Sequence, residues 1–177
     1  MSRGLGDVYK RQDISSQEFN PQGFTFSNDG TKMFLTGNNG DDVNEYTLST
    51  GFDVSTASFV DSFDISSQEE GPRDLAFNAD GTKMFVVGVL GDDVNEYTLS
   101  TAFDVSTSSF VDSFDISSQE NSPTGLAFNN DGTKMFIAGN GGDDINEYTL
   151  TTGFDVSTAS FVDSFDVSAQ DATPRGL

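Results

Sequence analysis

The sequence predicts an all-β fold in which a four-stranded antiparallel sheet is repeated three times. Three observations support this prediction. First, the string D-G-T-K-M-F recurs around Met33, Met84 and Met135, which are spaced by 51 residues. Second, each copy contains four short apolar or alternating runs that are separated by turn residues. Third, the sequence shows no run with the 3.6-residue apolar spacing of an amphipathic helix.

The repeats divide the chain into five segments. Three full repeats cover residues 13–63, 64–114 and 115–165. Residues 166–177 match the start of a fourth copy, and their proline takes the position of the prolines in the full copies (Pro174, after Pro21, Pro72 and Pro123). Residues 1–12 match no part of the repeat, resemble a vector- or adapter-derived translation, and are expected to lie outside the fold. They lack the apolar run of a signal peptide. Because the sequence stops within a repeat, we expect the chain to be a fragment of a longer protein.

The first repeat, residues 13–63, illustrates the four expected strands. Residues 24–26 alternate apolar and polar side chains, and residues 32–36 form an apolar run that we expect to be buried on both faces. The Asp-Gly pair between them is a strong hairpin signal, because glycine readily adopts a positive φ. Residues 43–48 are the third strand, and residues 58–65 are the fourth.

Four short antiparallel strands per repeat, with a turn signal every 8–12 residues, describe one blade of a β-propeller. A β-solenoid and a β-sandwich are the alternatives, but solenoid coils repeat at shorter periods, and the Asp-Gly hairpin favours meanders. We therefore predict three blades of 51 residues each in an incomplete propeller, since complete propellers have 4–8 blades. An open arc leaves two apolar sheet faces that invite self-association, and two chains meeting as a six-bladed ring would cover them.

The string P-x-G-[FL]-x-F-x-x-D-G-T-K-M-F-[LVI] resembles the blade signature of the lactonase-like, surface-layer "YVTN" and TolB-like propellers. The longer string that runs on through N-E-Y-T-L to F-D-V-S-T is similar to repeats of uncharacterised marine bacterial and phage-associated proteins. The resemblance covers residues 13–177. It implies the blade type, but it implies no single activity, because propellers carry many unrelated functions.

Loops of an antiparallel meander alternate between the two ends of its strands. We call one end the Gly-Asp-Asp face. It carries the loop between the second and third strands of each repeat, and the loop that leads into the next repeat. We expect this face to be strongly acidic and to hold any ligand site. Its expected carboxylates outside the Gly-Asp-Asp strings are Glu18, Glu69, Glu70 and Glu120.

The Gly-Asp-Asp strings contain the candidate metal ligands, because paired carboxylates on a glycine-rich loop are oxygen ligands that suit Ca²⁺. The alternative is an ordinary solvated loop, since the spacing matches no EF-hand and successive loops lie on different blades. No other cofactor is predicted. The candidate residues are Asp41, Asp42, Asp92, Asp93, Asp143 and Asp144.

The other repeated polar residues are expected to be structural. We expect the repeated lysines to neutralise neighbouring aspartates (Lys32, Lys83 and Lys134) and the tyrosines to pack in the core (Tyr46, Tyr97 and Tyr148). The D-V-S-T strings predict turns closed by side-chain-to-backbone hydrogen bonds. Positions where one repeat departs from the others are better candidates for a binding site. They include Phe19, Arg73 beside Asp74, and the apolar pair Val89-Leu90, which we expect to be exposed.

The composition excludes several function classes. The 177-residue chain has no His, Cys or Trp, so it offers no imidazole base, no thiolate nucleophile and no usual zinc site. It has 29 acidic and 8 basic side chains, a formal net charge of -21. Nucleic acid and anionic membranes are therefore not expected partners, because binding phosphates requires Lys and Arg.

The sequence favours a non-enzymatic binding or structural module that serves as a scaffold for a protein or glycan partner. We expect it to belong to a secreted, cell-surface or virion protein. The alternative is a Ca²⁺-dependent hydrolase that resembles the lactonase propellers. That function requires Asp, Asn and Glu side chains from several blades to converge on the central channel.

Overall fold

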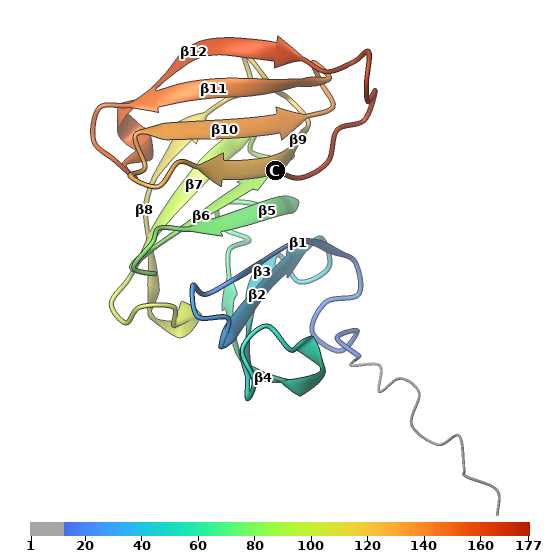
Figure 1. Cartoon of the computed structure of the whole chain (residues 1–177), viewed down its shortest axis with the longest axis vertical. Helices are drawn as coiled ribbons and strands as arrows, with labels where there is room; N and C mark the ends of the chain where they lie inside the picture. The colour runs from blue at the N-terminus through green and yellow to red at the C-terminus, as the bar shows by residue number, and fades with distance from the viewer. Residues whose placement is uncertain (1–12) are drawn as a thin grey trace, which may run out of the picture.

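The computed structural model describes residues 13–177, which form three four-stranded antiparallel sheets (Figure 1). The strand orders are β1-β2-β3-β4, β5-β6-β7-β8 and β9-β10-β11-β12. The chain is therefore an incomplete β-propeller of three blades, as the sequence predicts, and the arc does not close. The strands are Pro21–Phe26 (β1), Lys32–Gly37 (β2), Asp42–Leu48 (β3), Ala57–Asp64 (β4), Pro72–Phe77 (β5), Lys83–Gly88 (β6), Asp93–Leu99 (β7), Ser108–Asp115 (β8), Pro123–Phe128 (β9), Lys134–Gly139 (β10), Asp144–Leu150 (β11) and Ala159–Asp166 (β12).

The strands differ from the predicted limits mainly at β1. This strand begins at Pro21, three residues before the predicted start, because Pro21 pairs with Gly37 across a bulge that ends at Gly23. A bulge adds an unpaired residue and leaves no alternating pattern for the sequence to display. Strand β3 begins one residue early, and β4 is shifted by one residue at both ends.

The connection from the third to the fourth strand of each blade contains one turn of 3₁₀ helix. These turns are Val54–Thr56 (η1), Val105–Thr107 (η2) and Val156–Thr158 (η3). In the first blade the Asp53 carboxylate accepts the Ser55 N–H at 3.0 Å, and the Thr56 hydroxyl donates to the Asp53 carbonyl at 2.7 Å. The prediction that the D-V-S-T strings close turns by such bonds is confirmed.

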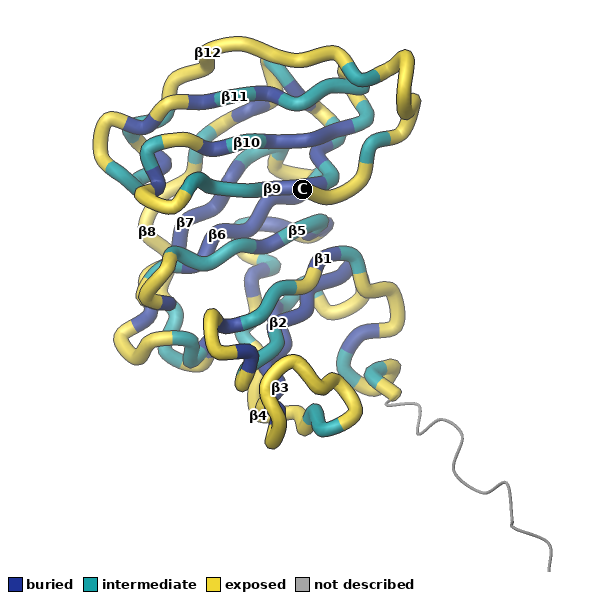
Figure 2. The backbone as a smooth tube through the Cα atoms, in the orientation of Figure 1, coloured by how far each residue is buried: buried dark blue, intermediate teal, exposed yellow. Residues whose placement is uncertain are grey.

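The apolar core lies between the sheets. One cluster joins the first blade to the second and the other joins the second to the third. Strand β6 contributes to both, since Met84 and Val86 pack in the first cluster whereas Phe85 and Val87 pack in the second. The burial on both faces that the sequence predicts for residues 32–36 is confirmed in β2, where the adjacent Phe34 and Leu35 are 0% and 7% exposed, and β6 repeats it. Figure 2 shows the result. The second and third strands of each blade are mostly buried, whereas the fourth strands β4, β8 and β12 are exposed.

The Asp-Gly turn requires glycine for two reasons. Gly81 has φ of +72°, where a side chain is strained, and a Cβ atom there would lie 2.2 Å from the ring of Phe103. Phe103 itself adopts φ of +56°, and its ring packs against Phe34 and Phe77. The equivalent phenylalanines Phe52 and Phe154 adopt the same backbone conformation, with φ of +60° and +59°, and the glycine leaves room for the ring.

Replacing Gly81 with Ala is expected to destabilise the chain by about 2 kcal/mol, from the left-handed backbone and the displaced ring together. Urea unfolding of Gly81→Ala, Phe103→Ala and the double variant would separate the two causes. We expect the glycine substitution to cost less in the Phe103→Ala background, because the ring is then missing. Equal costs in both backgrounds would contradict the contribution of the ring.

The tyrosines are buried in the core, as predicted, and those of the second and third blades pack between blades. Tyr46, Tyr97 and Tyr148 are 4%, 0% and 0% exposed. The ring of Phe63 on β4 meets Tyr97 of the next blade edge-on, with centroids 5.7 Å apart. Phe114 on β8 meets Tyr148 in the same way at 5.6 Å. Strands β4 and β8 therefore each place one aromatic ring against the following blade.

The hydroxyl of Tyr97 is buried and has no hydrogen-bond partner within residues 13–177. Burial, followed by the charges of Asp93 and Glu69, raises its pKa well above the usual range. Removing a buried hydroxyl without a partner relieves a desolvation cost. We therefore expect Tyr97→Phe to leave the free energy of unfolding within about 1 kcal/mol of the parent value or to raise it. A loss of several kcal/mol, measured by urea unfolding, would contradict this.

The repeated lysines pair with glutamates, so the expectation that they neutralise neighbouring aspartates is wrong. Lys32 Nζ lies 2.7 Å from Glu45 Oε1, because these side chains are diagonal neighbours on the same face of β2 and β3. Lys32 also donates to the Phe103 carbonyl of the next blade at 2.6 Å. The other oxygen of Glu45 accepts the Val105 N–H of that blade at 3.0 Å. The ion pair therefore connects two blades.

The same link joins the second blade to the third. Lys83 Nζ lies 2.6 Å from Glu96 Oε1 and donates to the Phe154 carbonyl at 2.5 Å, and the Val156 N–H donates to Glu96 Oε2 at 3.0 Å. Glu45 and Glu96 are buried at 1% and 2% exposure. The third blade repeats the ion pair between Lys134 and Glu147, but both side chains there are more exposed.

The C-terminal residues lie beside β9 (Figure 1). Thr124 Oγ1 donates to the Pro174 carbonyl at 2.7 Å. A Cβ atom on Gly125 would meet the Gly176 backbone at 2.7 Å, much as one on Gly23 would meet the Asp74 backbone at 2.6 Å. The segment therefore takes the position beside β9 that β5 takes beside β1.

Candidate functional site

The first strands of the blades line the inner side of the arc. Strand β5 lies between β1 and β9 (Figure 1). A cavity of about 690 Å³ opens where these strands begin, at the Gly-Asp-Asp face, and the C-terminal residues line its far side. The residue after the proline differs among the three full repeats. All four copies of this position line the cavity, as Gln22, Arg73, Thr124 and Arg175.

Hydrogen bonds between blades hold this inner wall in place. Arg73 Nη1 donates to Gln22 Oε1 at 3.0 Å, which connects β5 to β1. Asp74 occupies the position of Gly23 and Gly125 in the other repeats. Its two oxygens accept the N–H groups of Leu75 and Leu126, each at 2.9 Å, so it connects β5 to β9. Burial raises the pKa of Asp74, and the two N–H groups partly oppose that rise.

The cavity also contains the arginines of the described chain. The three ion pairs found within residues 13–177 all involve lysines on the strand faces. Arg73 is half-buried and Arg175 is exposed, and both line the cavity. The wall therefore presents guanidinium, carboxylate, amide and hydroxyl groups in a small space, which is a set of donors and acceptors suited to a polar ligand.

The Gly-Asp-Asp loops serve first as turns. Asp41, Asp92 and Asp143 adopt φ near +50°, a backbone conformation that Asp tolerates better than most residues. The Asp41 carbonyl accepts the Ile65 N–H at 2.9 Å, which ties this loop to the one that enters the next blade. Burial and the nearby charges of Glu70, Glu18 and Asp64 raise the pKa of Asp41. Its Oδ1 atom is buried without a hydrogen-bond partner in the described chain.

The second aspartate of each loop supports its own strand. Asp42 accepts a bond from Asn44 Nδ2 at 2.6 Å, Asp93 from Asn95 at 2.6 Å, and Asp144 from Asn146 at 2.7 Å. Within residues 13–177 the structure does not gather three or more carboxylates into a group that could hold a metal ion. The hypothesis that these aspartates bind Ca²⁺ therefore stays a prediction.

Three glutamates expected on the surface of the Gly-Asp-Asp face are instead buried. Glu18, Glu69 and Glu120 are 1%, 1% and 0% exposed. Glu69 accepts the N–H groups of Gly71, Leu90 and Gly91 at 2.6, 3.1 and 3.2 Å. Glu120 accepts three N–H groups in the same way, and Glu18 accepts two. These carboxylates close two loops together, and Glu70 is exposed as expected.

Two apolar side chains project from this face. Leu90 is 67% exposed, as predicted, whereas Val89 beside it is half-buried. Phe19, in the loop that enters the first blade, is 75% exposed.

Sequence reasoning singled out Arg73 and Asp74 but missed Gln22, Thr124 and Arg175. The signal that could have identified them is that the residue directly after the proline varies between repeats. This variation indicates a site only once the structure shows that β1, β5 and β9 place these residues around one cavity.

The fold is similar to that of solved β-propellers. A putative 6-phosphogluconolactonase from Bacteroides fragilis is 16% identical with a TM-score of 0.59, covering 83% of this chain and 39% of that one. The periplasmic gluconolactonase PpgL of Pseudomonas aeruginosa is 16% identical with a TM-score of 0.56, covering 82% and 39%. The Cps50 (Swd1) β-propeller domain of Myceliophteria thermophila is 12% identical with a TM-score of 0.54, covering 83% and 43%.

The chain thus spans about two fifths of the length of these structures, and at this level of identity the likeness shows the fold alone. No protein-family model matches the sequence, and no curated protein does. Across residues 13–177 there is no helix of the length and apolarity that a membrane span requires. We conclude that the chain is a β-propeller module.

Proposed function

We propose that the chain is a non-enzymatic binding module of a secreted, cell-surface or virion protein, with a protein or glycan partner and the glycan favoured. The observation that carries the proposal is the inner cavity, where near-identical repeats differ at the position of Gln22, Arg73, Thr124 and Arg175. Variation among otherwise repeated residues, concentrated on one concave wall, favours a role in recognition.

The chemistry of the wall favours a ligand with many hydroxyl groups. Arg73 offers donors, Asp74 is an acceptor, and Thr124 is both, so neighbouring hydroxyl groups of a sugar find complementary partners. A neutral glycan is also not repelled by the net charge of -21, whereas an anionic ligand is.

A glycan array followed by calorimetry on the best-bound neutral oligosaccharide tests the proposal. We expect Arg73→Gln to weaken binding about tenfold or more, because a hydrogen bond from a charged donor contributes about 1.5–3 kcal/mol. Lys134→Gln is the matched control, because it removes one positive charge outside the cavity and is expected to bind normally. Retention of full affinity by Arg73→Gln, or robust turnover of small esters and lactones, would count against the proposal.

The second candidate is a Ca²⁺-dependent, lactonase-like hydrolase. The Oδ1 atoms of Asp41, Asp92 and Asp143 favour it, because they are buried without a hydrogen-bond partner within residues 13–177 and carboxylate oxygen is a preferred ligand of Ca²⁺. Calorimetric titration with Ca²⁺ separates the candidates. Heat of binding and a rise in melting temperature would support the metal site, and the absence of both would remove it.

A further inference from the structure

We propose that the exposed face of the third blade binds the exposed face of the first blade in a second copy of this chain, head to tail. We call these surfaces the third-blade face (Lys134, Phe136, Ile145, Glu147 and Phe165) and the first-blade face (Ile14, Phe24, Met33, Phe52 and Val54). The inference is independent of the proposed glycan site, because it concerns the two ends of the arc and needs no ligand.

The first-blade face is the exposed equivalent of an established interface. Val54 is 53% exposed, whereas Val105 and Val156, at the same position in the later repeats, are both 0% exposed. Phe24 is 63% exposed, whereas its equivalents Leu75 and Leu126 are 3% exposed. The local sequence around these valines is nearly the same in each repeat. The difference in exposure arises because no blade packs against this side of the first one within residues 13–177.

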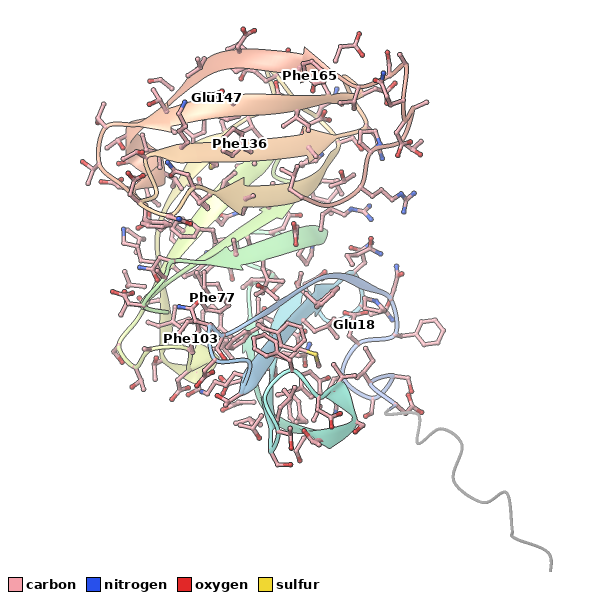
Figure 3. The ribbon with its side chains drawn as sticks, in the orientation of Figure 1. Glu18, Phe77, Phe103, Phe136, Glu147 and Phe165 are labelled. Atoms are coloured by element: carbon pink, nitrogen blue, oxygen red, sulfur yellow. The ribbon has the colours of Figure 1, made fainter. Side chains whose placement is uncertain are left out.

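The third-blade face is the other half of the same interface. Phe165 is 69% exposed, whereas Phe63 and Phe114 pack against the blade that follows them. Figure 3 shows Phe136, Glu147 and Phe165 on the outermost sheet. Phe136 and Ile145 are partly exposed, although Phe34, Phe85, Val43 and Val94 at these positions are fully buried.

The two faces are complementary in shape. The first-blade face contains a hollow of about 580 Å³ whose lining includes Ile14, Met33, Tyr46 and Val54. At the internal interfaces, the equivalent of Tyr46 receives the phenylalanine of the preceding fourth strand, as Tyr97 receives Phe63. Phe165 of one copy therefore fits the hollow beside Tyr46 of the other.

The faces are also complementary in hydrogen bonding. Between internal blades, the lysine donates to a phenylalanine carbonyl and the glutamate accepts a valine N–H. Lys134 and Glu147 already form the ion pair of this link. Phe52 and Val54 of a second copy present the carbonyl and the N–H that complete it. Because a single chain contains both halves of a repeated interface, a second copy is the occupant that the structure favours.

The C-terminal segment competes for part of this site. Residues 167–177 correspond to residues 14–24, so a docked second copy brings the same segment to the same place. The resident segment is held by the bond from the Val167 N–H to the Asp143 carbonyl at 2.9 Å and by the bond between Thr124 and Pro174. Docking must displace it, so a chain that ends at Asp166 is expected to associate more tightly than the full chain.

Sedimentation equilibrium over a wide concentration range tests the proposal with the full chain and with the chain that ends at Asp166. We expect both to associate reversibly, the shorter chain more tightly. We also expect added salt to strengthen association, because it screens the repulsion between two chains of charge -21. A closed ring and an open head-to-tail array both use this interface, and either supports the proposal.

Matched arginine substitutions locate the interface. Val54→Arg and Phe165→Arg are expected to weaken association about 30-fold or more, which corresponds to about 2 kcal/mol. Val60→Arg and Val162→Arg are the controls, because these valines are 48% and 50% exposed, much as Val111 is at 49% in the internal blade, and thus lie outside the interfaces. The four arginine variants replace exposed residues, and circular dichroism would verify that they and the shorter chain fold. A shorter chain that stays monomeric, or controls that weaken association as much as Val54→Arg, would overturn the proposal.

Discussion

Replacing Glu96 with Ala is expected to lower the free energy of unfolding by about 3–4 kcal/mol, because breaking a buried ion pair leaves an uncompensated charge. Glu96 is 2% exposed, and it connects Lys83 to the Val156 N–H of the third blade. The substitution leaves the Val156 N–H without its acceptor and Lys83 without its anionic partner at a blade interface, where the Phe154 carbonyl still accepts from Lys83. Urea unfolding, followed by circular dichroism, measures the loss.

The third blade supplies the matched control. Glu147 forms the same ion pair on the equivalent strands β10 and β11, but its side chain is 32% exposed, and within residues 13–177 no N–H group donates to its second oxygen. We expect Glu147→Ala to cost less than about 1 kcal/mol, as exposed ion pairs usually do. The comparison is made at a protein concentration where the chain is monomeric. Equal losses from the two substitutions would contradict the view that the link derives its stability from the neighbouring blade.

Replacing Glu69 with Ala is expected to destabilise the chain by about 3 kcal/mol or more. The carboxylate is 1% exposed and accepts three backbone N–H groups, and each buried donor left without a partner costs about 1–3 kcal/mol. Some of these donors lie at the surface of the loop, where water can replace the lost acceptor, so the total is smaller than the sum of three full penalties.

The next residue provides the control for Glu69. Glu70 is exposed, and we expect Glu70→Ala to change stability by less than about 0.5 kcal/mol. A companion variant, Gly88→Ala, disturbs the packing of the Glu69 carboxylate without removing it, because a Cβ atom at position 88 would lie 2.2 Å from the Glu69 carboxyl carbon. Comparable stability of Glu69→Ala and Glu70→Ala in thermal unfolding would show that the carboxylate does not hold the two loops together.

The candidate site was only partly predictable. Arg73 and Asp74 attracted attention because they break the repeat pattern, and the structure places both on the wall of the inner cavity. Arg175 was not predicted, because it lies in the incomplete fourth copy. It reaches the cavity because the C-terminal segment lies beside β9. Pattern breaks identify unusual residues, but only the packing of β1, β5 and β9 shows which of them share a space.

The sequence by itself determined the repeat, the four strands of each blade and the turns between them. These features depend on residues close together in the chain, such as the Asp-Gly pair and the alternation of apolar side chains. The buried strand around Phe85 and the turns at the D-V-S-T strings belong to the same class, because their signals lie within one repeat, although the 3₁₀ form of these turns was not predicted.

Only the tertiary structure decided which charged and apolar side chains are buried and which are exposed. Glu69 and Glu70 are adjacent and chemically alike, yet one closes two loops from inside and the other faces solvent. Val54 and Val105 occur in the same D-V-S-T string, yet one is half exposed and the other is fully buried. The physical reason is that burial depends on what packs against a residue. For most of these side chains the neighbour belongs to another blade, about which the local sequence carries no information.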